Sequence, residues 1–246
     1  MNIAVVFAGG TGQRMKSGVP KQFLEVYGKP ILIHTLEKFQ LNENIDKIYI
    51  ACKEEFIPLL KKLVKKYQIN KVSKTGITKG GATGQDSIFN GLQLARKENP
   101  GDSIVLLHDG VRPLIKDEVI TNAVNTAKKY GSAITCTPSY ETPVISLDGE
   151  YVESLPERKV VYTAQAPQAF ILDEIVDTHK KTRKINPSYE GIIDSCTLMK
   201  QNGKNIRIIV GNKGNIKVTT PEDYFDLLAR LSVEDQKQIM ELMENN

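Results

Sequence analysis

The residues best suited to chemistry lie close together near the N-terminus, where glycines are followed by cations: Gly9, Gly10, Gly12, Arg14 and Lys21. The apolar, β-branched run before them, residues 3–8, predicts a buried parallel strand. Glycine lets the chain turn sharply after such a strand and leaves backbone N–H groups uncovered, a concavity suited to phosphate oxygens. Because cations follow, the stretch predicts a nucleoside triphosphate site.

Two other glycine loops do not fit this stretch. A Walker A loop has a second glycine five positions after the first, and no glycine stands there after Gly9, Gly10 or Gly12. The dinucleotide fingerprint fails because Met15 occupies the place of its third glycine. A tight strand-to-loop turn with surface cations nearby is the alternative interpretation.

Apolar patterning downstream alternates between strand-like and helix-like segments. Strands are expected at 47–51, 71–73, 103–107, 133–137, 206–210 and 216–218, and helices at 30–39, 54–67, 83–97, 117–130, 173–182, 191–200, 220–231 and from 232 onward. Thr83 and Asp86 have the spacing of a capping box. The alternation predicts an α/β fold with a doubly wound, mostly parallel sheet. Ligands of such sheets bind beyond the carboxyl ends of the strands, where Gly80, Gly81 and Asp109 are expected.

The pattern changes between residues 138 and 162. Pro138, Pro143 and Pro156 break this segment into short pieces, and Asp148-Gly149 is a hairpin turn signal. We interpret the segment as a β-arm that protrudes from the main sheet. Since no linker or repeat is found elsewhere, residues 1–246 are expected to form a single domain that includes the arm.

Composition narrows the class of protein. The chain of 246 residues is 40% apolar and 25% charged, which is ordinary for a globular protein with a sizeable core. Its net charge of +4 is too small and too dispersed to indicate nucleic-acid binding. No apolar run approaches about 18 residues, and Cys52, Cys136 and Cys196 lack a metal-binding spacing. We therefore expect a cytoplasmic protein that binds no membrane.

Five motifs in a fixed order carry a resemblance to a known family. They are Ala8-Gly9-Gly10-Thr11-Gly12-Gln13-Arg14-Met15, Pro20-Lys21-Gln22-Phe23, His108-Asp109-Gly110-Val111-Arg112-Pro113, Ala166-Pro167-Gln168-Ala169-Phe170 and Asn215-Ile216-Lys217-Val218-Thr219-Thr220-Pro221-Glu222-Asp223. Together they resemble the cytidylyltransferases that make CDP-methylerythritol or CDP-ribitol. The similarity extends from Ile3 to about Leu228. It is specific for the superfamily and less specific for the acceptor substrate.

The resemblance implies a Rossmann-like nucleotidyltransferase that joins CTP to a sugar-alcohol phosphate with Mg²⁺ and releases pyrophosphate. It implies that Arg14, Lys21 and Lys217 are catalytic cations and that Asp109 helps to hold the metal. The implied nucleotide contacts are Phe7, Ala8, Gly9, Gly10, Thr11, Gly12, Gly80, Gly81, Ser87, Asp109 and Gly110. A capping or turn aspartate is the alternative for Asp109, and Arg112 is expected to pair with a carboxylate.

The chemistry itself requires no general base. An acceptor phosphate carries about −1.5 to −2 charges near neutral pH and is already a nucleophile. The obstacle is the approach of one anion to another, which positioning and fixed cations can overcome. The three histidines, His34, His108 and His179, are accordingly assigned no chemistry.

The resemblance also implies contacts to the acceptor. Lys217 would bridge the acceptor phosphate and the α-phosphate of CTP. Thr142 and Arg158 of the arm would hold the acceptor phosphate of a partner subunit, so the resemblance implies a homodimer formed through the arm.

The chain departs from the family pattern at three places. Gly84 stands where arginine is usual, which leaves strict preference for CTP open. Glu141 replaces an aspartate, and residues 192–196 replace a more acidic segment, both near the expected acceptor pocket. These departures favour a polyol phosphate, ribitol 5-phosphate, whose CDP product would serve teichoic-acid or capsule polymers. Methylerythritol 4-phosphate, used in isoprenoid synthesis, is the first alternative acceptor, and the phosphates of arabinitol, mannitol and glycerol are further alternatives. A non-catalytic nucleotide-binding regulator is the alternative from another class.

Overall fold

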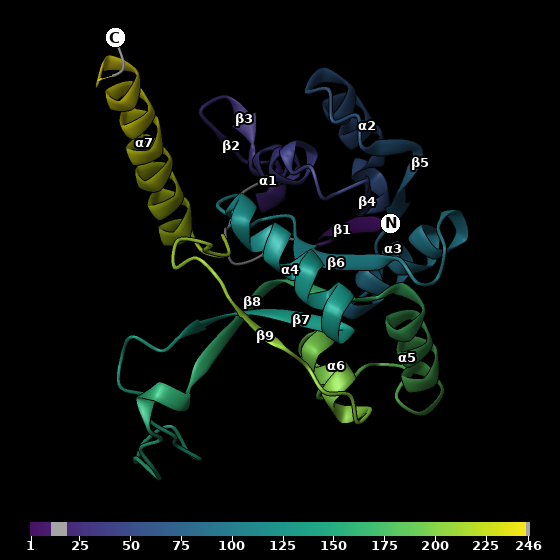
Figure 1. The fold of residues 1–246 in the computed structure, drawn as a ribbon, viewed down its shortest axis with the longest axis vertical. Coiled ribbons are helices and arrows are strands. Elements are labelled where there is room, and N and C mark those ends of the chain that lie inside the picture. Colours follow the sequence, from purple (N-terminus) through teal and green to yellow (C-terminus); the bar gives the residue numbers. More distant parts are fainter. Residues whose placement is uncertain (11–18, 245–246) are drawn as a thin grey trace.

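A central seven-stranded sheet organises the computed structural model, which describes residues 1–10 and 19–244 (Figure 1). In sheet order, the strands are β5 (Val72–Lys79), β4 (Lys47–Cys52), β1 (Asn2–Ala8), β6 (Ile104–Asp109), β8 (Tyr162–Ile171), β7 (Ser132–Pro138) and β9 (Ile208–Val210). β8 is antiparallel to both of its neighbours, and all other pairs in this sheet are parallel. The predicted α/β fold with a mostly parallel sheet is confirmed.

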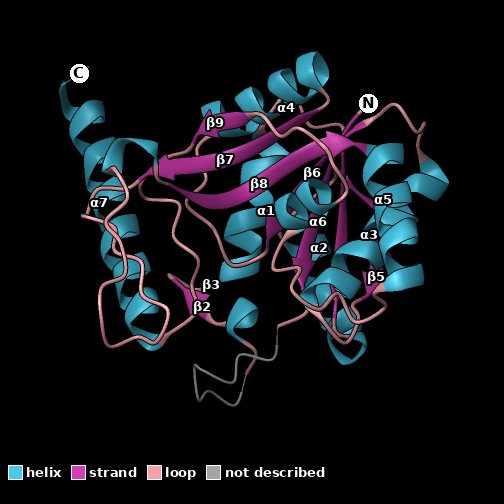
Figure 2. Ribbon diagram, turned by 90° about the horizontal axis from the view of Figure 1, so that it is seen from below, coloured by secondary structure: helices cyan, strands magenta, loops and turns pink. Residues whose placement is uncertain are grey.

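Helices cover both faces of the sheet (Figure 2). The helices are α1 (Ile31–Leu41), α2 (Ile57–Lys66), α3 (Gly84–Glu98), α4 (Asp117–Tyr130), α5 (Leu172–Ile185), α6 (Ser195–Gln201) and α7 (Pro221–Glu244). Short 3-10 turns lie at Lys21–Phe23, Glu54–Phe56 and Arg158–Val160, and β2 (Glu25–Val26) pairs with β3 (Lys29–Pro30) in a separate hairpin. Within the described ranges, no helix is both long and apolar enough to cross a membrane.

Alternate residues of β1 contribute to two apolar cores. Ala4 and Val6 pack in the core formed with α1, α2 and α4, whereas Ile3 and Val5 pack in the core formed with α3, α5 and α6. Neither core leaves these side chains any exposed surface. Complete burial of a valine or isoleucine side chain stabilises a protein by about 1.5–3 kcal/mol. An uninterrupted apolar run in the sequence is therefore what a strand covered on both faces requires.

β8 is the strand of the seven-stranded sheet that the sequence did not predict. It contains Pro167, and proline is unusual inside a sheet because it lacks the N–H group of the ladder. The chain accommodates it at a bulge, where residues 165–167 stand opposite Thr135 of β7. Thr135 Oγ1 donates a hydrogen bond of 2.7 Å to the Pro167 carbonyl. Pairing with β6 stops at Gln168, opposite Leu107, so residues 165–167 remain at the carboxyl edge of β6.

Other expectations were wrong in detail. β5 is longer than the 71–73 that we expected, and residues 216–218 form no strand. α6 begins at Ser195 rather than at position 191, because the Asp194 side chain caps the helix there. The two helices expected at 220–231 and from 232 onward are one continuous helix, α7. The capping box of α3, between Thr83 and Asp86, is confirmed.

Between β7 and β8 the chain leaves the body as an extended arm, residues 139–161 (Figure 1). Its regular structure is limited to a bridge between Ile145 and Ser154 and one 3-10 turn. Gly149 turns the chain with a φ of +81°, as the hairpin signal predicted. Leu147 near the tip is 85% exposed. The predicted arm is confirmed, and much of its apolar surface is open to solvent.

Candidate active site

The glycine loop lies at the carboxyl end of β1, where Gln22 supports it. Buried Gln22 donates hydrogen bonds from Nε2 to the carbonyls of Ala8 (2.7 Å) and Gly10 (3.2 Å). A Cβ on Gly9 would come 2.8 Å from Ser87 Oγ, so a larger residue would press on the first turns of α3. The sequence did not single out Gln22. Thr11, Gly12 and Arg14 lie outside the described residues.

A second loop joins β5 to α3 and faces the first. Ser87 Oγ accepts a hydrogen bond from the Gly81 N–H (3.0 Å) and donates one to the Thr83 carbonyl (3.0 Å). The capping box between Thr83 and Asp86 then fixes the first turn of α3. This helix begins at Gly84, and a helix N-terminus attracts anions through its free N–H groups and its dipole.

The two loops enclose a cavity of about 350 Å³, here called the nucleotide cavity. Its described lining consists of Phe7, Ala8, Gly9, Gly10, Lys21, Gln22, Gly81, Ala82, Thr83, Gly84, Ser87, Asp109, Val111 and Lys217. Most of the nucleotide contacts implied by the sequence therefore meet in one place. Gly80 and Gly110 do not line the cavity, although each adjoins a lining residue in the chain. Lys21 and Lys217 are far apart in the sequence and line the same cavity.

Asp109 lies at the base of this cavity between two cations. Lys217 Nζ lies 2.6 Å from Asp109 Oδ1, and Arg112 Nε lies 2.8 Å from Asp109 Oδ2. Asp109 is only 7% exposed, and burial by itself would raise its pKa. Lys217 and then Arg112 outweigh the burial and lower the pKa to about 2. The carboxylate is therefore ionised at neutral pH, and the expected pairing of Arg112 with a carboxylate is confirmed.

The segment that carries Lys217 is tied to the sheet by buried hydrogen bonds. Asn215 Nδ2 donates to the Ala166 carbonyl of β8 (2.7 Å), and Arg112 Nη1 donates to the Asn215 carbonyl (2.9 Å). The Val218 N–H donates to the Val111 carbonyl (2.9 Å). These bonds replace the strand expected at 216–218 and hold Lys217 beside Asp109.

A second cavity of about 280 Å³, here called the acceptor cavity, also reaches Asp109 and Lys217. It is lined by Phe7, Gly84, Gln85, Ile88, Leu107, Asp109, Arg112, Ala164, Gln165, Ala166, Gln168, Ile193, Asp194, Ser195 and Lys217. It shares Phe7, Gly84, Asp109 and Lys217 with the nucleotide cavity. Two ligands could thus meet at Lys217. Nothing in the sequence indicated Gln85 and Gln165, whereas Ser195 belongs to the segment 192–196 that was expected near the acceptor pocket.

Thr142 and Arg158, the remaining predicted acceptor contacts, are not brought to either cavity within one chain. Both residues are exposed on the arm. Arg158 Nη1 lies 3.4 Å from the Tyr140 carbonyl in the same arm.

The buried histidines and the cysteines are held in unreactive forms. Burial lowers the pKa of His108 to about 4 and that of His179 to about 3, so both rings are neutral near pH 7. Burial also raises the pKa of the Cys52 and Cys196 thiols to about 11, far from the thiolate form. These values agree with a chemistry that uses none of them.

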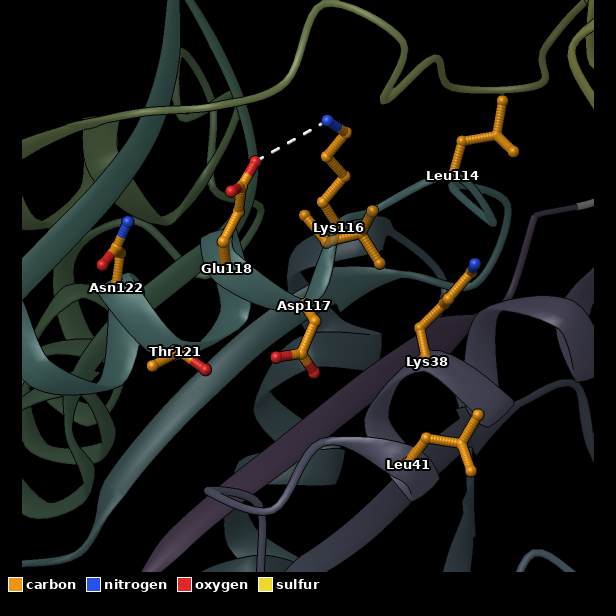
Figure 3. Close-up of a pocket in the computed structure, with 9 residues that line it drawn as sticks. Lys38, Leu41, Leu114, Lys116, Asp117, Glu118, Thr121 and Asn122 are labelled. Atoms are coloured by element: carbon orange, nitrogen blue, oxygen red, sulfur yellow. Dashed lines mark ion pairs between the residues drawn. The ribbon is translucent and has the colours of Figure 1, made fainter. Parts of the chain in front are cut away.

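A larger hollow, about 710 Å³, lies elsewhere (Figure 3). It is an open groove between the end of α1 and the start of α4, and Leu41 and Leu114 line it together with the exposed ion pair of Lys116 and Glu118. It contains no glycine loop and shares no residue with the two cavities described above. We therefore assign the chemistry to those two cavities and not to this groove.

The sheet, the paired glycine loops and a fixed cation between two cavities define the nucleotidyltransferase class. The family model for 2-C-methyl-D-erythritol 4-phosphate cytidylyltransferase (IspD) matches residues 2–233. The chain belongs to this cytidylyltransferase family.

Relatives within the family carry two names. The chain is 44% identical over 240 residues to the ribitol-5-phosphate cytidylyltransferase of Vibrio parahaemolyticus, covering 97% of this chain and 99% of that one. It is 37% identical over 222 residues to the 2-C-methyl-D-erythritol 4-phosphate cytidylyltransferase of Clostridium botulinum, covering 90% and 93%. A solved 4-diphosphocytidyl-2C-methyl-D-erythritol synthase from Anaerococcus prevotii has a TM-score of 0.79 at 30% identity, covering 94% and 95%.

Replacing Lys217 by alanine is expected to raise the pKa of Asp109. In this variant burial still raises the pKa of Asp109, and only Arg112 remains beside the carboxylate to lower it. A carboxyl group whose pKa is lower in the folded protein than in the unfolded protein stabilises the fold. This stability is fully present above the pKa of the unfolded state, and it is lost as the pH falls through the pKa of the folded state. The variant should therefore lose stability at higher pH than the wild type on acidification. Carboxyl ¹³C NMR of Asp109 and acid unfolding curves measure both effects.

The matched control is Lys116→Ala, which removes an exposed lysine paired with Glu118 and should leave both measurements unchanged. An Asp109 pKa that does not respond to the loss of Lys217 contradicts the arrangement of charges described above.

Proposed function

We propose that the protein transfers CMP from CTP to a polyol phosphate, ribitol 5-phosphate, and releases pyrophosphate. The observation that carries the proposal is the meeting of the nucleotide and acceptor cavities at Lys217. The acceptor cavity, at about 280 Å³, is at the small end of ligand cavities and fits a small sugar-alcohol phosphate. The choice of ribitol rests on the relatives at 40–44% identity that are named ribitol-5-phosphate cytidylyltransferases. The CDP product would enter teichoic-acid or capsule synthesis in the cytoplasm.

The reaction follows from this arrangement as a single displacement. An oxygen of the acceptor phosphate attacks the α-phosphorus of CTP, a new P–O bond forms, and the bond to the β-phosphate oxygen breaks with release of pyrophosphate. Lys217 keeps part of its ammonium group free for phosphate oxygens, because its side chain is 45% exposed and one hydrogen points to Asp109. Its charge offsets the repulsion between the two anions where they meet. Lys21 acts on the triphosphate side, and we assign the same task to Arg14.

For Mg²⁺ we propose Asp109 together with oxygens of the triphosphate. Asp109 is the one acidic residue in the described lining of the nucleotide cavity, and it is ionised. Mg²⁺ in phosphate-transfer sites binds one or two carboxylates and fills its shell with phosphate oxygens and water, so this donor set fits. The carboxylate oxygens retain lone pairs beyond those used by Lys217 and Arg112. The metal would neutralise charge on the triphosphate.

We also propose a homodimer in which the arm completes the partner's acceptor cavity. Thr142 and Arg158 are exposed, and neither lines a cavity of its own chain. Large apolar side chains of the arm, among them Leu147, Tyr151 and Leu155, are also exposed, and exposed apolar patches mark interaction surfaces. Arginine binds phosphate with two parallel hydrogen bonds, which suits Arg158 to an acceptor phosphate.

Pyrophosphate release from CTP and Mg²⁺ across a panel of acceptors tests the proposed reaction. We expect release with ribitol 5-phosphate, none after chelation of Mg²⁺, and a decrease of more than about a hundredfold in kcat for Lys21→Ala, because one preset donor at developing charge contributes about 3–4 kcal/mol. Lys62→Ala, on the exposed face of α2, is the control for folding and charge. Release with methylerythritol phosphate alone would overturn the choice of acceptor. If no acceptor in the panel leads to pyrophosphate release, a nucleotide-binding regulator is favoured.

Mixing two inactive variants tests the shared site. Lys21→Ala disables the nucleotide cavity of its own chain, and Arg158→Ala disables the arm that reaches the partner. A mixed dimer contains one site with an intact Lys21 and an intact arm, so we expect activity after mixing and subunit exchange that neither variant shows alone. Light scattering should report a dimer. A monomer, or no recovery of activity on mixing, contradicts the proposed dimer.

A further inference from the structure

We propose that Gln85 and Ser195 bind hydroxyl groups of the acceptor's carbon chain and thereby set the acceptor specificity. The inference rests on the proposed function and names side chains that would recognise the part of the acceptor remote from its phosphate. Gln85 lies in the first turn of α3, and Ser195 is the first residue of α6. Both line the acceptor cavity, and neither lines the nucleotide cavity.

Each of these side chains has a buried oxygen without a partner. Gln85 is 5% exposed and Ser195 is 1% exposed, yet Gln85 Oε1 and Ser195 Oγ form no hydrogen bond with any residue in the described ranges. A buried polar atom that is left without a hydrogen bond destabilises a folded protein. Because both residues line the same cavity, we infer that a ligand in this cavity supplies the missing partners.

The surrounding hydrogen bonds hold Ser195 in place without using its hydroxyl. Gln168 Nε2 donates to Asp194 Oδ2 (2.8 Å), and the Cys196 N–H donates to Gln168 Oε1 (2.9 Å). Asp194 Oδ1 accepts the cap bond from the Thr197 N–H (2.8 Å). The start of α6 is thus fixed against β8 by residues on both sides of Ser195. Its hydroxyl has no structural hydrogen bond to lose.

Gln85 is held in a similar way by its neighbour. Asp86 completes the capping box with Thr83 and forms an ion pair with Arg183 of α5, at 2.7 Å. The first turn of α3 is therefore rigid, while the Gln85 amide remains unpaired. Gln165 Oε1 also lacks a partner. It faces Gly211, because a Cβ built on that glycine would lie 3.0 Å from Gln165 Oε1. We therefore do not include Gln165 in the acceptor contacts.

The chemistry of the cavity suits a chain of CHOH groups. A hydroxyl group both donates and accepts, so it can donate to Gln85 Oε1 and exchange a hydrogen bond of either direction with Ser195 Oγ. Ile88, Leu107 and Ile193 offer apolar surface to the carbon backbone of the ligand. A site that hydrogen-bonds a substrate hydroxyl discriminates strongly against the analogue that lacks it, because its own buried group is then left unpaired.

The test is a set of thermodynamic cycles in which the wild type, Gln85→Met and Ser195→Ala are each assayed with ribitol 5-phosphate and with its singly deoxygenated analogues. We expect each variant to lower kcat/KM for ribitol 5-phosphate about tenfold, the effect of losing one neutral hydrogen bond, with the KM for CTP unchanged. We also expect each variant to lose the wild-type discrimination against one deoxy analogue. Gln93→Met on the exposed face of α3 and the exposed Ser188→Ala are matched controls that should change neither quantity.

The outcomes separate the inference from the proposed function. An equal loss for ribitol 5-phosphate and for every deoxy analogue shows a structural effect and overturns the inference alone, as does an unchanged kcat/KM in both variants. Wild-type protein that transfers CMP to no polyol phosphate overturns the proposed function and the inference with it. Should the wild type use methylerythritol phosphate, the same cycles with its deoxy analogues decide the inference in the same way.

Discussion

One buried carboxylate shared by two cations is the constraint on which the site depends. Asp109 binds Lys217 through one oxygen and Arg112 through the other, in a position that is almost closed to solvent. A buried charge without such partners would be neutralised or would destabilise the fold. Because Lys217 and Arg112 both stabilise the ionised form of Asp109, the carboxylate holds Lys217 at the junction of the two cavities. With two cations beside one carboxylate, the site also keeps a net positive charge, which suits two anionic substrates.

The fold supplies the three charges from different parts of the chain. Asp109 ends β6, Arg112 follows it in the loop, and Lys217 comes from a segment that follows β9 and is tied to β8 through Asn215. The bulge in β8 leaves the Ala166 carbonyl at the carboxyl edge of β6, where Asn215 can reach it. An irregular strand next to a site is a common way to position groups that a regular ladder would not reach. Here the irregularity lies between the acceptor cavity and the segment that carries Lys217.

Sequence reasoning found the parts of the molecule that depend on local rules. The strand before Gly9, the capping box of Thr83 and Asp86 and the protruding arm follow from residue types over short distances. It missed β8, because Pro167 argues against an interior strand and the bulge that accommodates it depends on β7. It divided α7 in two at position 232, whereas the helix continues past this position. Local signals compete, and tertiary packing decides between them.

The same distinction holds for the site. Lys21, Asp109 and Lys217 were predicted from motifs, and the structure brings them to one cavity. Gln85 carries no signal of its own in one sequence, and Gln22 and Ser195 lie in segments that gave neither residue a role, because these roles depend on burial and on hydrogen bonding in the fold. Arg14 was predicted with the others and lies outside the described residues. Chemistry that depends on residue type is visible in the sequence, whereas chemistry that depends on the surroundings needs the fold.

In the proposed reaction, two substrates meet at Lys217 with no covalent intermediate on the protein. The stereochemistry at the α-phosphorus tests it most directly. With one diastereomer of CTP that carries sulfur on the α-phosphate, and with the acceptor that the enzyme uses, a single in-line displacement predicts inversion of configuration in the CDP product. Retention of configuration, measured by ³¹P NMR, would require two displacements and would contradict the account.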